Sequence, residues 1–168
     1  RRDPDAAVGR IESAVDDLDL TVKHIRTAIF ALESSRPHEQ GIRDRVLGLC
    51  REAAGALGFA PRVLLDGPID SVVGDDVAAD LLATLREALS NVARHAGASR
   101  VDVTVAADRD EIRLRVVDDG SGPPARGRED GRGLGNMAAR ARRHGGELEL
   151  GAASPSGTDL CWRARLDG

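Results

Sequence analysis

Aromatic residues are scarce in this chain of 168 residues, which contains two phenylalanines, one tryptophan and no tyrosine. So few rings argue against a protein that binds single-stranded nucleic acid by stacking bases on aromatic side chains. An excess of positive charge is lacking as well, because the formal net charge is −4. Nucleic-acid binding needs a basic surface, and we therefore expect no nucleic-acid partner.

Cysteine and histidine are also sparse and scattered. Cys50 and Cys161 stand far apart and form no CxxC pair, and the four histidines occur singly. This pattern argues against a zinc site and favours two buried, reduced thiols. A signal peptide and an apolar run long enough to span a bilayer are also missing from the sequence. We therefore expect a cytoplasmic globular protein without direct membrane contact.

A heptad pattern dominates the first part of the chain. Its apolar residues alternate at spacings of three and four, and they are Val8, Ile11, Val15, Leu18, Val22, Ile25, Ile29 and Leu32. This spacing predicts a long helix in a coiled coil or helical bundle, which Pro37 ends. Such a helix needs partner helices from another copy or from sequence outside the chain. An ordinary amphipathic helix on a core is the alternative.

The remainder of the chain alternates between helical and strand-like patterns. We expect helices near 41–57, 76–95 and 136–144, and strands near 62–67, 101–105, 112–116, 147–151 and 158–166. The strands near 101–105 and 112–116 have period two, which predicts an antiparallel pair with one wet face. The whole pattern predicts an α/β fold, a two-layer sandwich with helices on one face of a mixed sheet.

The motif "LREALSNVARHA" places polar residues along one helical face. Glu87, Asn91 and either Arg94 or His95 follow at i, i+4 and i+7 or i+8. Carbonyl and carboxylate oxygens suit Mg²⁺, which usually shares its ligands with the phosphates of a substrate. An ordinary solvated helix face can carry the same residue types, so the motif alone does not decide between the two.

The motif "DDGSG" follows directly on a strand pattern. An aspartate at a strand end can accept a hydrogen bond from an exocyclic amine, and glycines let the backbone approach a flat ring closely. A hairpin turn is the simpler interpretation of Asp118 to Gly122. However, the glycine-rich loop that we expect over about 120–135 is too long for a simple hairpin.

Two further short motifs are weak when taken singly. In "GRGLG", Gly131, Gly133 and Gly135 precede a helix that we expect to start near Asn136, and backbone amides at such a helix start favour phosphate. In "SGTDL", Thr158 stands at the start of the last strand, where its hydroxyl could reach a base or ribose.

In this order, the four motifs resemble the N, G1, G2 and final Gly-Thr motifs of the GHKL (Bergerat-fold) ATP-binding domain. More narrowly, the chain is similar to bacterial sensor histidine kinases of the NarX/DesK-like class, and to the actinobacterial oxygen- and redox-sensing kinases with GAF domains. The resemblance covers roughly residues 6–166. It implies that residues 1–36 are the second helix of a dimerisation and phosphoacceptor domain, and that residues 40–168 are the ATP-binding catalytic domain.

The resemblance also implies roles for the residues at the adenine end. Asp118 would accept a hydrogen bond from the adenine amine. Gly120 and Gly122 would shape the pocket around the ring, and Thr158 would support the adenine from the last strand. Asp119 would point away from the pocket.

At the phosphate end, the resemblance implies that Asn91 ligates Mg²⁺. Glu87 would be the catalytic residue, orienting water or the metal. Arg94 and His95 would face phosphate or ribose. The residues expected to close over the phosphates are Gly133, Leu134 and Gly135.

The activity implied is that of a protein-histidine kinase, which uses Mg-ATP to phosphorylate its own histidine and then a response regulator. The parent protein would be a homodimer through the heptad helix. None of His24, His38, His95 and His144 lies in a motif resembling the family's "RDLHD" phosphoacceptor. We therefore expect the first dimerisation helix to be absent and this chain not to autophosphorylate alone. Arg132 stands where the class often has histidine, and it keeps the positive charge.

Two alternatives stay open from the sequence. One is a serine protein kinase of the anti-sigma-factor type, which shares the ATP-binding fold. The other is a non-catalytic dimerisation module with a degenerate nucleotide pocket.

Overall fold

The computed structural model describes residues 41–123 and 131–166. The heptad segment and the predicted dimerisation helix over 1–36 lie outside these described residues. The same holds for part of the glycine-rich segment, residues 124–130.

Helices and strands alternate along the described chain much as the sequence predicts. In chain order, the elements are α2 (Ile42–Leu57), β1 (Arg62–Asp66), α3 (Ile69–Val72), α4 (Asp75–Asn91), the π-helical turn η1 (Val92–Ala96), β2 (Val101–Ala107), β3 (Glu111–Asp118), α5 (Gly131–Arg143), β4 (Leu148–Ala152) and β5 (Thr158–Arg165). The short helix α3 and the π-helical turn were not predicted.

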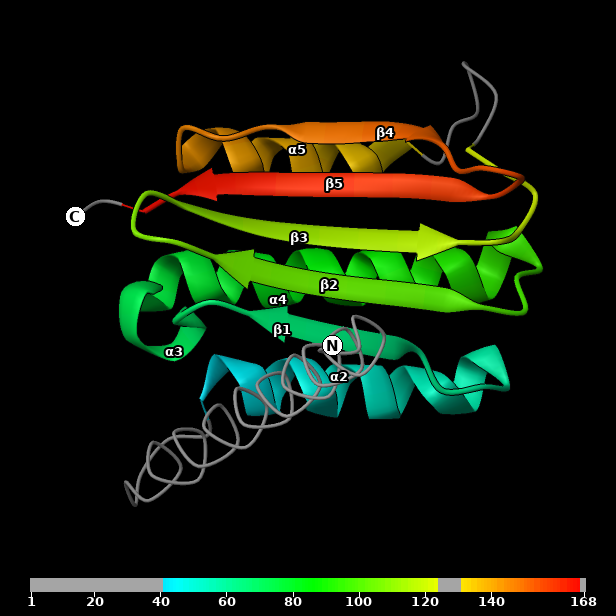
Figure 1. The fold of residues 1–168 in the computed structure, drawn as a ribbon. Helices are drawn as coiled ribbons and strands as arrows, with labels where there is room; N and C mark the ends of the chain where they lie inside the picture. The colour runs from blue at the N-terminus through cyan, green and yellow to red at the C-terminus, as the bar shows by residue number, and fades with distance from the viewer. Residues whose placement is uncertain (1–40, 124–130, 167–168) are drawn as a thin grey trace, which may run out of the picture. The chain divides into compact units, whose positions relative to one another are not determined.

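The strands form one mixed sheet in the order β1-β2-β3-β5-β4 (Figure 1). β1 runs parallel to β2, and the other neighbours are antiparallel. The residues of β2 and β3 alternate between a buried face and a more open face, because successive side chains point to opposite sides of a sheet. The predicted antiparallel pair with one wet face is therefore confirmed.

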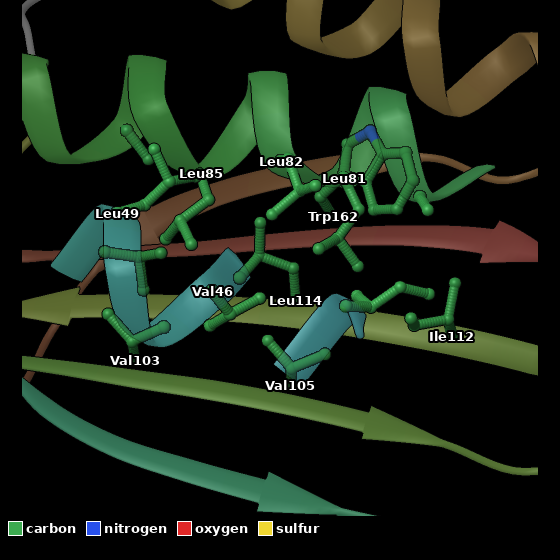
Figure 2. Packing of buried hydrophobic residues seen from close by; sticks show 14 of the residues in the cluster. Val46, Leu49, Leu81, Leu82, Leu85, Val103, Val105, Ile112, Leu114 and Trp162 are labelled. Atoms are coloured by element: carbon green, nitrogen blue, oxygen red, sulfur yellow. The ribbon is translucent and has the colours of Figure 1, made fainter. Parts of the chain in front are cut away.

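The helices α2, α4 and α5 cover one face of this sheet, with α4 in contact with both α2 and α5 (Figure 1). Trp162 is fully buried at the centre, and Figure 2 shows it with Leu81 and Leu114 between helix and strands. Burying each such side chain contributes about 1.5–3 kcal/mol. The indole Nε1 of Trp162 donates to the carbonyl oxygen of Met137 at 3.2 Å, which ties α5 to β5. The predicted two-layer α/β sandwich is confirmed.

Three predictions from the sequence are wrong in detail, two on helix bounds and one on the burial of a cysteine. Helix α5 begins at Gly131 and not near Asn136, so its glycines lie inside the helix. Glycine is a poor helix former, but the buried Met137 and Ala141 hold this helix against the core. The helix expected over 76–95 leaves α-helical geometry after Asn91. Only one of the two cysteines is buried, because Cys161 is half-buried on the open face of the sheet.

Candidate functional site

A cavity of about 290 Å³ opens at the end of α4, between this helix and the sheet. Its lining comes from α4, η1, β3, α5, β4, β5 and the segment that follows β3. The lining residues are Ala88, Asn91, Val92, His95, Ala96, Val116, Asp118, Ser121, Gly122, Pro123, Leu134, Leu150, Thr158 and Leu160. Apolar residues outnumber polar ones in this wall, and such a mixture suits a small-molecule site.

Asp118 supplies the buried carboxylate of this cavity. It ends β3 and is only 5 % exposed. Its Oδ1 accepts hydrogen bonds from the amide of Gly120 at 2.9 Å and from the amide of Thr158 at 3.3 Å. No hydrogen bond described for the structured part of the chain reaches Oδ2. The carboxylate is thus held in place by one oxygen, and the other can accept a hydrogen bond from a ligand.

Asp119, the next residue, has a different set of partners. Its Oδ1 accepts from the amides of Ser99 and Arg100, both at 2.8 Å, and its Oδ2 accepts from the Ser99 hydroxyl at 2.6 Å. The Ser99 hydroxyl, followed by these two amides, lowers the pKa of Asp119 below its ordinary value. Asp119 therefore fastens the end of β3 to the turn before β2 and does not line the cavity.

Two glycines allow the chain segments around Asp118 to approach each other. A Cβ on Gly120 would lie 2.3 Å from the carbonyl oxygen of Ala96, which also accepts from the Ser121 amide at 2.9 Å. A Cβ on Gly157 would lie 1.9 Å from the carbonyl oxygen of Asp118, and Gly157 has a positive φ of 103°. No other residue type fits either place without a backbone shift.

The π-helical turn decides which of two basic residues reaches the cavity. A regular α-helix would continue the stripe through Glu87 and Asn91, but the π turn rotates the residues after Asn91. His95 lines the cavity, whereas Arg94 is exposed and lies outside the lining. The structure therefore does not bring Arg94 to this cavity.

Glu87 lies next to the cavity and not in its lining. It is half-buried, and a Cβ added to Gly133 would approach its Oε1 to 2.4 Å. Glu87 of α4 and Gly133 of α5 are thus close neighbours. Gly135 is exposed with open space around it, so it has no part in this contact.

The predicted site residues consequently fall into three groups. Those that line the cavity are Asn91, His95, Asp118, Gly122, Leu134 and Thr158. Those that support it from outside are Gly120, which shapes the chain beside Asp118, and the neighbours Glu87 and Gly133. Arg94 and Gly135 lie apart. The side chain of Arg132 is outside the described residues.

Sequence reasoning missed the apolar wall of the cavity. Val116 of β3 and Leu160 of β5 line it from the sheet, and Leu150 of β4 lines it at the sheet edge. The alternation of Val116 and Leu160 along their strands is the signal of core residues, and nothing in it distinguishes a cavity wall from the core. Ser121 was also missed, although it lies inside the "DDGSG" motif.

The residues present fit a purine nucleotide better than a resident metal ion. Apolar side chains and one buried acceptor suit a flat ring that carries an amine. Among the described residues, no group of three or more His, Cys, Asp or Glu side chains is placed to hold a metal. Asn91 and Glu87 offer oxygen donors, which suffice for Mg²⁺ when phosphate oxygens supply further ligands.

This arrangement defines a nucleotide-binding α/β domain, in which a mixed sheet and its helices enclose a buried carboxylate. The sequence model of the histidine kinase-, DNA gyrase B-, and HSP90-like ATPase family matches residues 76–168, more than half of the chain. The chain therefore belongs to this family.

Several sensor kinases are similar to the chain over much of its length. Sensor histidine kinase LnrJ of Bacillus subtilis is 30 % identical over 87 % of the chain, and sensor histidine kinase NarS of Mycobacterium tuberculosis is 32 % identical over 90 %. Nitrate/nitrite sensor protein NarX of Escherichia coli is 32 % identical over 73 % of the chain. The chain spans 34 %, 36 % and 20 % of the length of these three proteins, respectively.

Solved structures agree on the fold. The ATP-binding domain of PrrB from Mycobacterium tuberculosis superposes with a TM-score of 0.57 at 25 % identity, covering 77 % of this chain and 96 % of PrrB's. Within the described part of the present chain, no helix combines the length and apolar character needed to cross a membrane.

Proposed function

We propose that this chain is the ATP-binding catalytic part of a two-component sensor histidine kinase. In the parent protein it would supply the γ-phosphate of ATP to a histidine of the dimerisation domain, for onward transfer to a response regulator. The observation that carries the proposal is Asp118, a buried carboxylate with one oxygen left to accept, set in an apolar cavity. The sensor kinases that resemble the chain support it.

At the adenine end, the proposal assigns recognition to few groups. The free Oδ2 of Asp118 accepts a hydrogen bond from the exocyclic amine, which distinguishes adenine from a base with a carbonyl at that position. Val116 and Leu160 contribute apolar surface against the ring, because both line the cavity from the sheet. Thr158 stands beside Asp118 and offers its hydroxyl to the same end of the ligand.

At the phosphate end, Asn91 and His95 line the cavity from α4 and the π turn. Asn91 would hold Mg²⁺ together with phosphate oxygens, and Glu87 would orient water or the metal from its place beside Gly133. The metal supplies charge neutralisation, and phosphoryl transfer depends mainly on positioning and such neutralisation. The start of α5 adds backbone amides, which favour negative charge.

The proposal extends to the partners and place of the parent protein. A homodimer through the heptad helix would bring the catalytic domain to a phosphoacceptor histidine, and a response regulator would receive the phosphoryl group. The domain would work in the cytoplasm, where ATP is available. Because no histidine of this chain lies in an acceptor motif, the chain alone would bind Mg-ATP without phosphorylating itself.

Calorimetric titration with Mg-ATP tests the proposal. Asp118→Asn should weaken binding by on the order of 10- to 100-fold, because an accepting charged oxygen is replaced by an amide. Asp159→Asn makes the same chemical change on the open face of the sheet and should leave the affinity unchanged. No binding of Mg-ATP by the unaltered protein, or equal affinities for it and Asp118→Asn, would refute the proposal.

The nature of the acceptor separates a histidine kinase from a serine kinase with the same fold. The protein is incubated with labelled ATP and, in turn, with a histidine-bearing dimerisation fragment of a sensor kinase and with a candidate anti-sigma-factor partner. Acid-labile phosphate on the first supports the proposal. Acid-stable phosphoserine on the second supports the serine kinase, and nucleotide binding without any transfer supports a non-catalytic module.

A further inference from the structure

A cluster of charged side chains joins α4 to α5 away from the nucleotide cavity. Asp80 of α4 has a side chain that is only 13 % exposed. Its Oδ2 lies 2.9 Å from Nε2 of His144, and its Oδ1 accepts a hydrogen bond from the Arg143 guanidinium at 2.9 Å. None of these three residues lines the cavity. The nucleotide site as described above makes no use of them.

The Asp80 carboxylate therefore interacts with several basic groups at the end of α5. Arg140 approaches the same Oδ1, with its Nε at 3.8 Å. Asp76, one turn earlier on α4, lies 3.9 Å from Nδ1 of His144, but its side chain is 79 % exposed. Asp80 is thus the only acidic residue of the described chain that pairs with Arg140 or Arg143.

The two ends of α5 are held very differently. Just after the helix, the Arg165 amide donates to the carbonyl oxygen of His144 at 2.9 Å. Met137 in the middle of α5 and Ala141 in its last turn are fully buried. At the start of the helix, no side-chain hydrogen bond or ion pair described for the structured chain joins residues 133–136 to another element. This start is also rich in glycine, which is a poor helix former.

The spacing on α4 connects the cluster to the nucleotide site. Asp80 and Glu87 are seven residues apart, which is two helical turns or about 10.5 Å along one face of α4. Asp80 contacts the end of α5, and Glu87 meets Gly133 near its start. The two helices therefore run antiparallel, and the position of α5 along α4 sets where Gly133 and Leu134 lie.

We infer that Asp80 is a positioning residue for the nucleotide site. Through Arg143 and His144 it fixes the register of α5 along α4, and it thereby places Gly133 against Glu87 and Leu134 in the cavity wall. This inference rests on the proposed function, because its consequence is a change in the affinity for Mg-ATP. The effect depends on charge, since without the carboxylate the half-buried Arg140 loses its counter-ion.

The test compares Mg-ATP affinity in Asp80→Asn, Asp80→Glu and Asp76→Asn, measured well below the unfolding transition of each variant. Asp80→Asn keeps the shape and removes the charge, and it should weaken binding by about tenfold, within the range that mutations between coupled sites produce. Asp80→Glu should restore most of the affinity, because the exposed Arg143 can follow a longer carboxylate. Asp76→Asn, the matched control, should change the affinity less than about twofold.

A second readout reports the register itself. Amide hydrogen exchange of residues 133–136 should accelerate in Asp80→Asn, while exchange in β5 stays as in the unaltered protein. A lower melting temperature with unchanged affinity and unchanged exchange of 133–136 would show a merely structural role and overturn the inference.

The results distinguish a failure of the positioning role from a failure of the proposed function. If the unaltered protein does not bind Mg-ATP, the proposed function fails. If it binds and Asp80→Asn binds equally well, only the positioning role fails. Should Asp80→Asn not fold, Arg143→Met removes one partner from a largely exposed position and should weaken binding by about threefold. Unchanged affinity in that variant would overturn the inference.

Discussion

Two hollows of the described chain lie on opposite faces of the sheet, and the larger of these two is not the candidate site. The cavity beside α4 measures about 290 Å³, and the groove on the open face measures about 510 Å³. The residues lining this open-face groove are Arg113, Arg115, Glu149, Leu150, Gly151, Ala152, Asp159, Cys161 and Arg163. Size therefore does not separate a binding site from a surface depression in this domain.

The two hollows differ in how far their charged side chains are paired with one another. In the open-face groove, Arg115 makes two hydrogen bonds to Asp159, at 2.9 and 2.6 Å, and Arg163 pairs with Glu149 at 2.6 Å. Each carboxylate of these pairs has a basic partner, in contact with water where such pairs contribute about 0–1 kcal/mol, although Nε of Arg163 is buried without a hydrogen-bond partner within the described chain. In the cavity, Asp118 is buried among apolar side chains with one oxygen unused. An incompletely satisfied polar group in a water-poor place can bind a ligand strongly.

The largest difference should appear when one methyl group is added behind Asp118, at Gly157, and one is added in the open-face groove, at Gly151. Gly157→Ala places a Cβ against the Asp118 carbonyl at a positive φ, and backbone strain alone costs about 1–3 kcal/mol. We expect a strongly destabilised domain that has lost Mg-ATP binding. Gly151→Ala, in the open-face groove, meets open space and should shift the free energy of unfolding by less than about 0.5 kcal/mol.

Chemical denaturation and nucleotide titration of the two glycine variants check this expectation. Retention of full stability and affinity in Gly157→Ala would show that the approach of β5 to Asp118 is looser than described. A loss of affinity in Gly151→Ala would show that the open-face groove contributes to nucleotide binding.

The fold was largely predictable because its signals are local. The alternation in β2 and β3 gave the antiparallel pair, and the apolar spacing in α4 gave the central helix. The π turn after Asn91 was not predictable from that spacing, because the hydrogen bonds of a π turn leave no distinctive mark in residue type. The sequence therefore leaves Arg94 and His95 as equal candidates for the stripe through Asn91, and the structure brings His95 to the cavity and turns Arg94 away.

The site was predictable only in part, because its essential relations are between distant segments. The resemblance of "DDGSG" to a known motif singled out Asp118. That Asp118 is free at Oδ2 depends on where the amides of Gly120 and Thr158 lie. The approach of Gly133 to Glu87 likewise joins residues 46 positions apart, and no pattern within either motif specifies it.

The two cysteines test a related difference, between the buried core and the open-face groove. Burial raises the pKa of Cys50 to about 11, whereas Cys161 is half-buried in the open-face groove. Because the thiolate is the reactive form, a disulfide reagent at pH 8 should modify Cys161 at least about tenfold faster than Cys50. Cys161→Ser should remove the fast phase of the reaction, and Cys50→Ser should leave it in place. A fast phase that disappears with Cys50→Ser would contradict the burial of α2 against the core.

The smallest effect on Mg-ATP affinity should come from a substitution of Asp119. This residue follows Asp118, but both oxygens of its carboxylate already accept hydrogen bonds from Ser99 and Arg100. Its folded-state pKa is lowered, first by the Ser99 hydroxyl, so its contribution to stability is present above the unfolded-state pKa of about 3.9 and is lost as the pH falls through the folded-state value. Asp119→Asn should therefore be less stable than the unaltered protein at pH 7, and the gap should narrow below about pH 4. Urea unfolding at pH 7, 5, 4 and 3 measures this gap, which should stay constant if the carboxylate has no charge-dependent partners.

Mg-ATP affinity at pH 7 should change little in Asp119→Asn, in contrast to Asp118→Asn, because only Asp118 presents its carboxylate to the cavity.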